Sequence, residues 1–454
     1  MESRISKADI PEKSVKEKAI AARSAFLAMS KSTAAQRSKA LKLLAAKLAK
    51  EKNRVFHENA KDLEYADKLV VQGKMQHALL KRLKVDRHKL DEIISEVKGV
   101  NSQPDPMGKT LSSIELDKGL ELFQISVPIG VICTIFESRP DALVQISSLC
   151  IKSGNAVLLK GGSEAQHSNR VLAQIVRESL EGAGMPVDAV QLIEKREEIS
   201  ELLMLDSLVD LILPRGSSQL VKYIQENTRI PVLGHSSGIC HVYIDKYADM
   251  KKAVSISYDA KVQYCAVCNA AETLLVDRSV AEKFLPLIAG KYAAANVEMR
   301  CDDISMKMLQ KKGFDVKAAT EEDWDTEYND MIISIKVVQG LDAAIDFING
   351  HSSKHTDSIV TQNKKHANEF LVRVDSASVF WNASTRFSDG YRFGKGAEVG
   401  ISTGKIHARG PAGMESLMTY KYVLSGKGHI VADYAGKKAR RYTHKKMKKE
   451  FRFK

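Results

Sequence analysis

The sequence predicts an α/β protein with a doubly wound parallel sheet, and three observations support this. From Val127 onward, short apolar runs such as IGVICTIF and NAVLLKGG alternate with segments whose apolar residues recur at helical spacing. The first of these helical segments ends at Gly154, a typical helix-terminating residue. A second block of alternating helices and strands begins near Val254, with strands at ETLLVD, DMIISIKVV and DSIVTQ. Because successive βαβ units build parallel sheets, we expect a nucleotide-type domain followed by a second α/β domain.

The remaining segments flank these two blocks. Residues 14–100 have apolar positions at three- and four-residue spacing and are expected to be helical, and NSQPDPMG follows as a loop with two prolines. The next segment, LSSIELDKGLELFQISVP, alternates like an extended hairpin with DKG as its turn. Near the end of the chain, MTYKYVLSGKGHIV is expected to form a hairpin or one long strand that pairs with this earlier hairpin. Together they would form a protruding β element.

Composition is that of a soluble globular protein of several domains: 454 residues, 44% hydrophobic and 28% charged. No run approaches the roughly 18 apolar residues of a membrane span, and the N-terminal residues lack the apolar core of a secretion signal. The six cysteines do not form a disulfide framework, which indicates a reducing compartment, with the cytoplasm as the default. They are Cys133, Cys150, Cys240, Cys265, Cys268 and Cys301.

The net charge of +13 is concentrated at the C-terminus. Residues 435–454 contain ten Lys and Arg against one Glu, which leaves only about +4 for the rest of the chain. Such a tail can bind nucleic acid or an anionic surface. We favour the simpler interpretation, a solvated and mobile terminus.

Two cysteines three residues apart, in KVQYCAVCNAAETLL, allow four interpretations. Cys265 and Cys268 could form a redox pair, or share a zinc site with the distant His351 and His355. Both could be buried small apolar residues. Alternatively Cys268 is a nucleophile, placed at the start of an apolar helix CNAAETLL where the helix dipole would stabilise its thiolate.

Four long motifs resemble a known family. They are VPIGVICTIFESRPDALVQISSLCIKSGNAVLLKGGSEA, KVQYCAVCNAAETLLV, INGHSSKHTDSIV and NASTRFSDGYRFGKGAEVGISTGKIHARGPAGMES. These closely resemble the γ-glutamyl phosphate reductases, also called glutamate-5-semialdehyde dehydrogenases, of the aldehyde dehydrogenase superfamily. The resemblance runs from about residue 15 to residue 425. ESRPDALVQISSL is closest to the reductase half of pyrroline-5-carboxylate synthase, but no kinase segment precedes it here, so a free-standing reductase is expected.

The resemblance implies an aldehyde-dehydrogenase-like fold and the NADPH-dependent reduction of L-glutamate 5-phosphate to L-glutamate 5-semialdehyde, the second step of proline biosynthesis from glutamate. The nucleophile of the family is the second cysteine of VQYCAVCN, which is Cys268, and Cys265 would be a bystander. The alternative is an oxidising aldehyde dehydrogenase for a different semialdehyde. Those enzymes carry a glutamate base, whereas the similar segment PVLGHSSG places Val232 at that position. A third interpretation is a binding protein with a basic tail that has lost catalysis.

The resemblance also implies the site residues. The catalytic ones are Cys268 and Asn269, the latter as an oxyanion donor; the substrate-binding ones are Arg139, Arg386, Arg392, His407 and Arg409. Those that bind NADPH/NADP are Lys160, Gly161, Gly162, Ser163, Gly216, Ser217, Ser218 and Glu327. Glu164 leaves NADH open as the cofactor. We expect no metal, and His351 and His355 are interpreted as structural.

Domain boundaries follow from the same comparison. Residues 1–108 and 128–245 would form the NADP-binding domain, 246–378 the catalytic domain, 109–127 and 412–434 the β oligomerisation element, 379–411 a return segment with active-site loops, and 435–454 the basic tail. The β element predicts a homodimer or homotetramer. Association with glutamate 5-kinase is a further expectation, and neither membrane nor nucleic-acid binding is expected.

Overall fold

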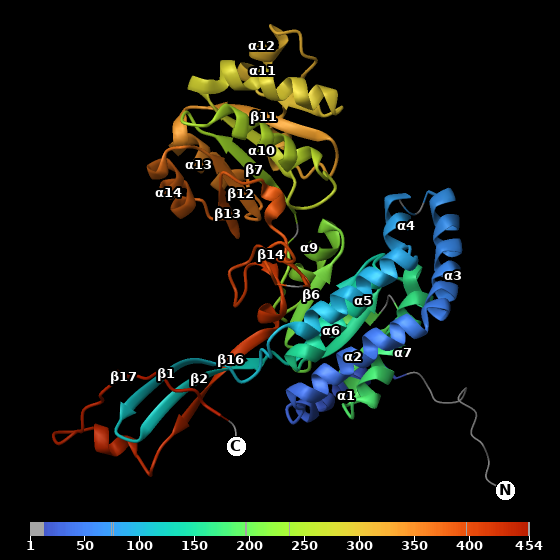
Figure 1. Cartoon of the computed structure of the whole chain (residues 1–454), viewed down its shortest axis with the longest axis vertical. Helices are drawn as coiled ribbons and strands as arrows, with labels where there is room; N and C mark the ends of the chain where they lie inside the picture. Colours follow the sequence, from blue (N-terminus) through green and yellow to red (C-terminus); the bar gives the residue numbers. More distant parts are fainter. Residues whose placement is uncertain are drawn as a thin grey trace. The chain divides into compact units, whose positions relative to one another are not determined.

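The computed structural model (Figure 1) describes residues 13–73, 75, 77–195, 198–235, 237–395 and 397–452. These residues form two compact units. Unit 1 contains the described residues of Met1–Gly216, Tyr223–Val232 and Gly413–Lys454, and unit 2 those of Ser217–Lys222 and Leu233–Ala412. Each unit has a parallel β-sheet, which confirms the predicted α/β fold class.

The parallel sheet of unit 1 has the strand order β5-β4-β3-β6. Its strands are β3 (Val131–Phe136), β4 (Ala156–Gly161), β5 (Val190–Ile193) and β6 (Leu211–Arg215). Every residue of β3 and β4 is buried, as expected for parallel strands that are covered on both faces. The sequence predicted β3, β4 and β6, but not β5.

Helices of unit 1 begin and end at recognisable residues. The Ser14 side chain accepts a hydrogen bond from the Glu17 backbone N–H at the start of the first helix. Gly154, at the end of the sixth, has φ 77°, a left-handed conformation that glycine adopts without strain. The helices are α1 (Val15–Met29), α2 (Ala34–Lys50), α3 (Lys52–Val71), α4 (His77–Leu83), α5 (Arg87–Ser102), α6 (Pro140–Ser153), α7 (Gln166–Gly182) and α8 (Glu198–Leu203). They confirm the predicted helical region.

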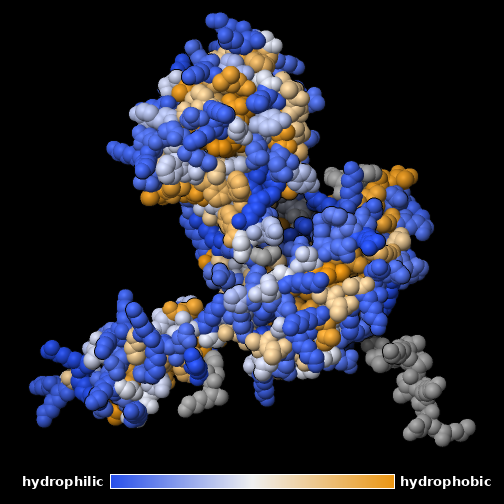
Figure 2. Space-filling model, in the orientation of Figure 1, coloured by the Kyte–Doolittle hydropathy of each residue, from blue (hydrophilic) through white to orange (hydrophobic). Residues whose placement is uncertain are grey.

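An antiparallel sheet completes unit 1, with the strand order β16-β2-β1-β17. Its strands are β1 (Thr110–Asp117), β2 (Leu120–Pro128), β16 (Met418–Ser425) and β17 (Lys445–Lys446). Strand β16 pairs with β2 along its whole length, so the predicted pairing of the two segments is confirmed, and 418–425 is one strand rather than half of a hairpin. Figure 2 shows mostly hydrophilic residues on the visible face of this sheet.

The basic tail differs from the prediction of a solvated, mobile terminus. Lys445 and Lys446 pair with β1, and the backbone N–H of Met447 donates to the Ser113 carbonyl. Two carboxylates and one aromatic ring of the hairpin hold the tail. Arg440 pairs with Asp117, Lys449 pairs with Glu121, and Phe451 packs on Phe123. The described part of the tail is folded onto the sheet, because carboxylates of the hairpin pair with its basic side chains and the edge of β1 pairs with its backbone.

The parallel sheet of unit 2 has the order β10-β9-β11-β8-β7-β12-β13. Its strands are β7 (Cys240–Ile244), β8 (Ala271–Asp277), β9 (Glu298–Cys301), β10 (Lys317–Ala318), β11 (Ile332–Val338), β12 (Thr356–Val360) and β13 (Ser378–Trp381). The predicted domain boundary after residue 245 is too late, because β7 hydrogen-bonds to β8 and β12 in the middle of this sheet. The structural boundary lies at residues 232–233.

Helices cover the second sheet with apolar side chains such as Phe284 and Tyr292, which are fully buried. They are α10 (Met250–Val262), α11 (Arg278–Ala294), α12 (Asp303–Gln310), α13 (Gly340–His351) and α14 (Lys364–Arg373), and α9 (Ser218–Glu226) contains the division between the units. Two short strands, β14 (Gly400–Ser402) and β15 (Gly410–Ala412), pair in the return segment. In the described part of the chain no helix has the length and apolar character needed to span a membrane.

Candidate active site

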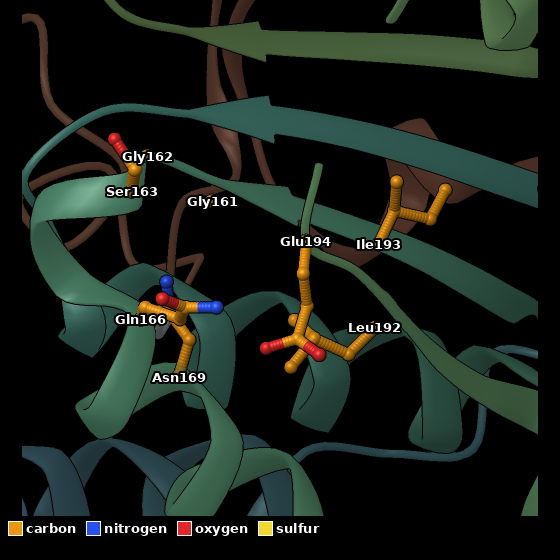
Figure 3. A pocket seen from close by; sticks show the side chains of 8 residues that line it. All are labelled: Gly161, Gly162, Ser163, Gln166, Asn169, Leu192, Ile193 and Glu194. Carbon is orange, nitrogen blue, oxygen red and sulfur yellow. The ribbon is translucent and has the colours of Figure 1, made fainter. Parts of the chain in front are cut away.

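A small pocket in unit 1 lies where β4 and β5 end and α7 begins (Figure 3). Its lining residues are Gly161, Gly162, Ser163, Gln166, Asn169, Leu192, Ile193 and Glu194. A Cβ at Gly161 would lie 2.2 Å from the Asn169 Nδ2 atom and 3.1 Å from the Phe136 ring, so these two side chains would have to move for any larger residue. The turn lies next to the start of α7, where backbone N–H groups favour an anionic ligand, and the cofactor role of its residues stays a prediction.

Lys160 lies at the end of β4 and is 4% exposed. Its ammonium group donates to the backbone carbonyls of Gly161 and Glu194, at 2.7 and 3.3 Å. Glu164 accepts hydrogen bonds from the backbone N–H and the hydroxyl of Ser138. The buried Lys160 ammonium group therefore lies next to the pocket, and the Glu164 carboxylate is bound to the loop that contains Ser138.

The other predicted cofactor residues lie in two further loops. Gly216 follows β6 in unit 1, and Ser217 and Ser218 begin α9 in unit 2, where the Ser217 hydroxyl accepts from the Leu220 N–H at 3.4 Å. Glu327 lies in the loop before β11 of unit 2 and is half-buried. Burial raises the pKa of Glu272, and the charge of Glu327 raises it further.

Cys268 lies in a turn between α10 and β8, within unit 2. The expected helix CNAAETLL is wrong and the expected strand ETLLVD is confirmed, because Ala271–Asp277 is strand β8, fully buried between β7 and β11. The predicted stabilisation of the thiolate by a helix dipole therefore does not apply. Cys268 is partly exposed, as a nucleophile must be, and Cys265 precedes it in the same loop.

Two residues of the preceding segment hold the Cys268 backbone. A Cβ at Gly238 would lie 2.2 Å from the Cys268 carbonyl oxygen and 2.4 Å from its Cα atom, so the two chains are in direct backbone contact. The Cys240 thiol donates to the same carbonyl at 3.2 Å. Burial raises the pKa of Cys240 well above its usual value, which keeps this donor protonated.

Two imidazoles flank the Cys268 sulfur. One ligand atom from each of His235, Cys268 and His355 lies within 4.8 Å of the other two. His235 contacts the Ile401 carbonyl through Nδ1 at 2.8 Å, and His355 is fully buried with Nδ1 at 2.8 Å from the Thr356 hydroxyl. The sequence-based interpretation of His355 as structural missed this proximity. The segment PVLGHSSG is of interest in the sequence for Val232, whereas in the structure its residues His235 and Gly238 lie near Cys268.

Asn269 is buried, and its amide donates to the Ser388 carbonyl at 2.8 Å. This bond fixes the loop that carries Arg386 and Arg392. The structure thus gives Asn269 a positioning role, and the oxyanion role stays a prediction.

Of the five predicted substrate-binding residues, Arg386 lies near Cys268, and Arg392 lies next to Arg386. Burial lowers the pKa of Arg386, the neighbouring Arg392 lowers it further, and the charge of the Cys268 sulfur raises it. Arg386 Nε donates to Gln263 Oε1 at 3.0 Å, and Arg392 donates to the Arg386 carbonyl at 3.0 Å. This part of the site can therefore attract an anionic substrate.

The other three predicted substrate residues are placed differently. Arg409 contacts both a side-chain oxygen and the carbonyl of Asp375, at 3.2 and 3.0 Å, so it has a structural partner. His407 is exposed. Arg139 belongs to unit 1, where it precedes α6 and pairs with Asp141 at 3.5 Å. The role of these three residues in substrate binding stays a prediction.

Comparison with known proteins bears on the family. Residues 4–312 match the aldehyde dehydrogenase family. The chain belongs to the aldehyde dehydrogenase family. It is 54% identical over 439 residues to the gamma-glutamyl phosphate reductase of Methanosarcina barkeri, which covers 96% of this chain and 98% of that protein. A gamma-glutamyl phosphate reductase of Acetivibrio thermocellus is 49% identical, over 96% of this chain and 99% of that protein.

A solved structure agrees with these relatives. The crystal structure of gamma-glutamyl phosphate reductase from Thermotoga maritima has a TM-score of 0.88 and 39% identity, and covers 92% of this chain and all of that one. An acetylating aldehyde dehydrogenase from Geobacillus thermoglucosidasius, at 18% identity and a TM-score of 0.62 over 91% of this chain and 97% of that one, shares the fold. The predicted resemblance to this family of aldehyde dehydrogenases is confirmed.

Proposed function

We propose that this aldehyde dehydrogenase family member reduces L-glutamate 5-phosphate to L-glutamate 5-semialdehyde and phosphate with NADPH, the second step of proline biosynthesis from glutamate. The observation that carries the proposal is a partly exposed Cys268 whose backbone is fixed by Gly238, with two imidazoles and a buried arginine around it. The names of the relatives, at 54% identity and less, support this substrate.

Cys268 acts as the nucleophile. Its thiol proton passes to a nearby imidazole, the sulfur attacks the C5 carbonyl carbon, a C–S bond forms, and the C–O bond to phosphate breaks. Phosphate leaves with its negative charge, and a thioester on Cys268 remains. His235 and His355 are near enough to Cys268 to take the proton after small movements.

Arg386 and Arg392 bind the anionic part of the substrate near the sulfur. They compensate negative charge when phosphate leaves, because the planar guanidinium group matches the geometry of phosphate oxygens. Arg139, His407 and Arg409 stay proposed substrate contacts, and Arg409 would have to share its guanidinium between the substrate and Asp375.

The glycine turn at the end of β4 lies beside the start of α7, and this placement supports a dinucleotide site there. Lys160 and Ser163 would bind the adenosine ribose and its 2′-phosphate, Gly216–Ser218 the pyrophosphate, and Glu327 the second ribose. When bound, NADPH supplies the hydride that reduces the thioester to the aldehyde and frees the thiolate.

Val232 supports reduction over oxidation to an acid. Its side chain has no carboxylate that could activate water, and its backbone forms a bridge with Ile212. Without a base at this position, water attack on the thioester is slow, and the thioester lasts until reduction.

Location and assembly complete the proposal. All six cysteines are free, which supports a reducing compartment, and we place the enzyme in the cytoplasm. The sheet of β1, β2 and β16 would join subunits into a homodimer or homotetramer, and association with glutamate 5-kinase belongs to the same proposal.

The test is phosphate-dependent reduction of NADP with glutamate semialdehyde. Cys268→Ser should lower kcat by roughly 10³-fold or more while cofactor binding remains, whereas Cys265→Ser should keep near wild-type activity. Oxidation that proceeds without phosphate and yields glutamate would overturn the assignment in favour of an oxidising dehydrogenase.

A further inference from the structure

The three groups around the nucleophile have the chemistry of a zinc site. Among the described residues, His235, Cys268 and His355 are the one group of histidine, cysteine or carboxylate side chains close enough to share an ion. Two imidazoles and a thiolate are preferred Zn²⁺ ligands, and a water molecule would complete a tetrahedron. All three residues belong to unit 2.

Distances between the rings agree with shared coordination. The ring centres of His235 and His355 are 5.1 Å apart, with an interplanar angle of 74°. With Zn–N bonds of about 2.0–2.1 Å and tetrahedral angles, two imidazoles on one zinc have centres roughly 5 Å apart. The donor atoms lie within 4.8 Å of one another, so closing on an ion requires movements of about 1 Å.

The outer contacts of the rings also match those of metal ligands. A zinc-bound histidine commonly donates its other ring N–H to a backbone carbonyl or a similar acceptor, which fixes the ring and its tautomer. His235 does this through Nδ1 to the Ile401 carbonyl, so in the neutral ring the lone pair is on Nε2. His355 has Nδ1 at the Thr356 hydroxyl, and its buried Nε2 has no hydrogen-bond partner among the described residues.

We propose that His235, Cys268 and His355 bind one Zn²⁺, or another thiophilic divalent ion, and that this ion reversibly blocks the nucleophile. Binding replaces the thiol proton by a Zn–S bond and releases that proton to solvent, with no change in oxidation state. The neighbouring Arg386 and Arg392 oppose a cation, which sets the affinity below that of a structural zinc site. The inhibition rests on the proposed role of Cys268 in the reaction, whereas the binding does not.

Cobalt titration of the full-length protein tests the binding without any substrate. We expect one Co²⁺ per chain, with the visible bands of tetrahedral coordination and a near-ultraviolet thiolate-to-metal band. Cys268→Ser should abolish the thiolate band, and His235→Gln should weaken binding roughly 10- to 100-fold. Cys265→Ser and His351→Asn are matched controls that should leave the titration unchanged, since neither residue is in the cluster. A thiolate band that survives Cys268→Ser, or His235→Gln with wild-type affinity, would overturn the site.

A second measurement avoids variants that fail to fold, which is a concern for the fully buried His355. Zn²⁺ should protect Cys268 of the wild-type protein from iodoacetamide, and a chelator should restore its reactivity. Unchanged alkylation in saturating Zn²⁺ would contradict the proposal. If Co²⁺ binds but the phosphate-dependent assay shows no turnover, the reductase assignment fails and the metal site stands. If turnover is normal and no ion binds, only the metal site fails.

Discussion

Gly238 lies directly against the backbone of Cys268, so closely that a Cβ there would come within 2.2 Å of the Cys268 carbonyl oxygen. The contact is between two backbones, and the neighbouring Cys240 thiol binds the same carbonyl. Because backbone atoms cannot turn aside as a flexible side chain can, residue 238 controls where the sulfur lies.

Gly238→Ala should therefore displace Cys268. We expect kcat to fall about 100-fold, because a shift of roughly 1 Å at a reacting atom costs that much, while NADP binding persists. Steady-state kinetics and a cofactor titration measure the two effects. Gly290→Ala in α11 is the matched control: nothing lies within 4 Å of its added Cβ, and it should stabilise the protein by about 0.5–1 kcal/mol. Wild-type kcat in Gly238→Ala would show that the loop moves freely.

Arg392 should attract anions to Cys268 because its charge lies close enough to lower the pKa of Arg386, which in turn senses the Cys268 sulfur. Arg392→Gln is expected to slow alkylation of Cys268 by anionic iodoacetate several-fold and to leave neutral iodoacetamide almost unaffected. Peptide mapping of the labelled cysteine measures both rates. Arg409→Gln serves as the comparison, since Arg409 is bound to Asp375 and should matter less. Equal slowing with both reagents would indicate a structural role for Arg392.

The sequence predicted the parts of the protein that depend on local patterns. Buried strands β3 and β4, the glycine turn at Gly161 and the nucleophile Cys268 all lie in contiguous motifs. The sequence allows both a helix at 268–275 and a strand at 272–277, because a short apolar run has no distinguishing period. The place of this segment between β7 and β11 makes it a strand. The short strands β5, β9, β10 and β13 lacked a long enough signal for the same reason.

The features that the sequence did not predict depend on contacts between segments that are distant in the chain. Asn269 binds Ser388, which is 119 residues away, and His235 meets Cys268 and His355 only through the loops that connect strands. The tail contact of Ser113 with Met447 spans 334 residues. Propensity and periodicity report on neighbours along the chain, so these pairings were beyond their reach.

Lys261 and Glu272 form a fully buried ion pair at 2.6 Å, with neither side chain exposed. Burial raises the pKa of Glu272, and the ammonium of Lys261 counteracts this. Glu272→Gln should cost about 3–5 kcal/mol in the free energy of unfolding, because it leaves a buried charge uncompensated. The double change Lys261→Met with Glu272→Leu should recover most of that loss. Urea unfolding measures both, and Glu64→Gln, which breaks the exposed pair with Lys68, should have no measurable effect. Equal losses in the single and double variants would refute the pairing.

The docked tail protects the outer edge of β1, which would otherwise present unpaired backbone groups to solvent. Deleting residues 435–454 removes the β17 pairing, the Lys449–Glu121 ion pair and the Phe451 ring that packs on the buried Phe123. We expect faster hydrogen exchange at the β1 amides and a greater tendency to aggregate, while alkylation of Cys268 in unit 2 is unchanged. Phe451→Ala should give a smaller change of the same kind, because it keeps the strand pairing. If exchange in β1 is as slow without the tail as with it, the hairpin and β16 are stable by themselves, and the basic residues of the tail must have another purpose.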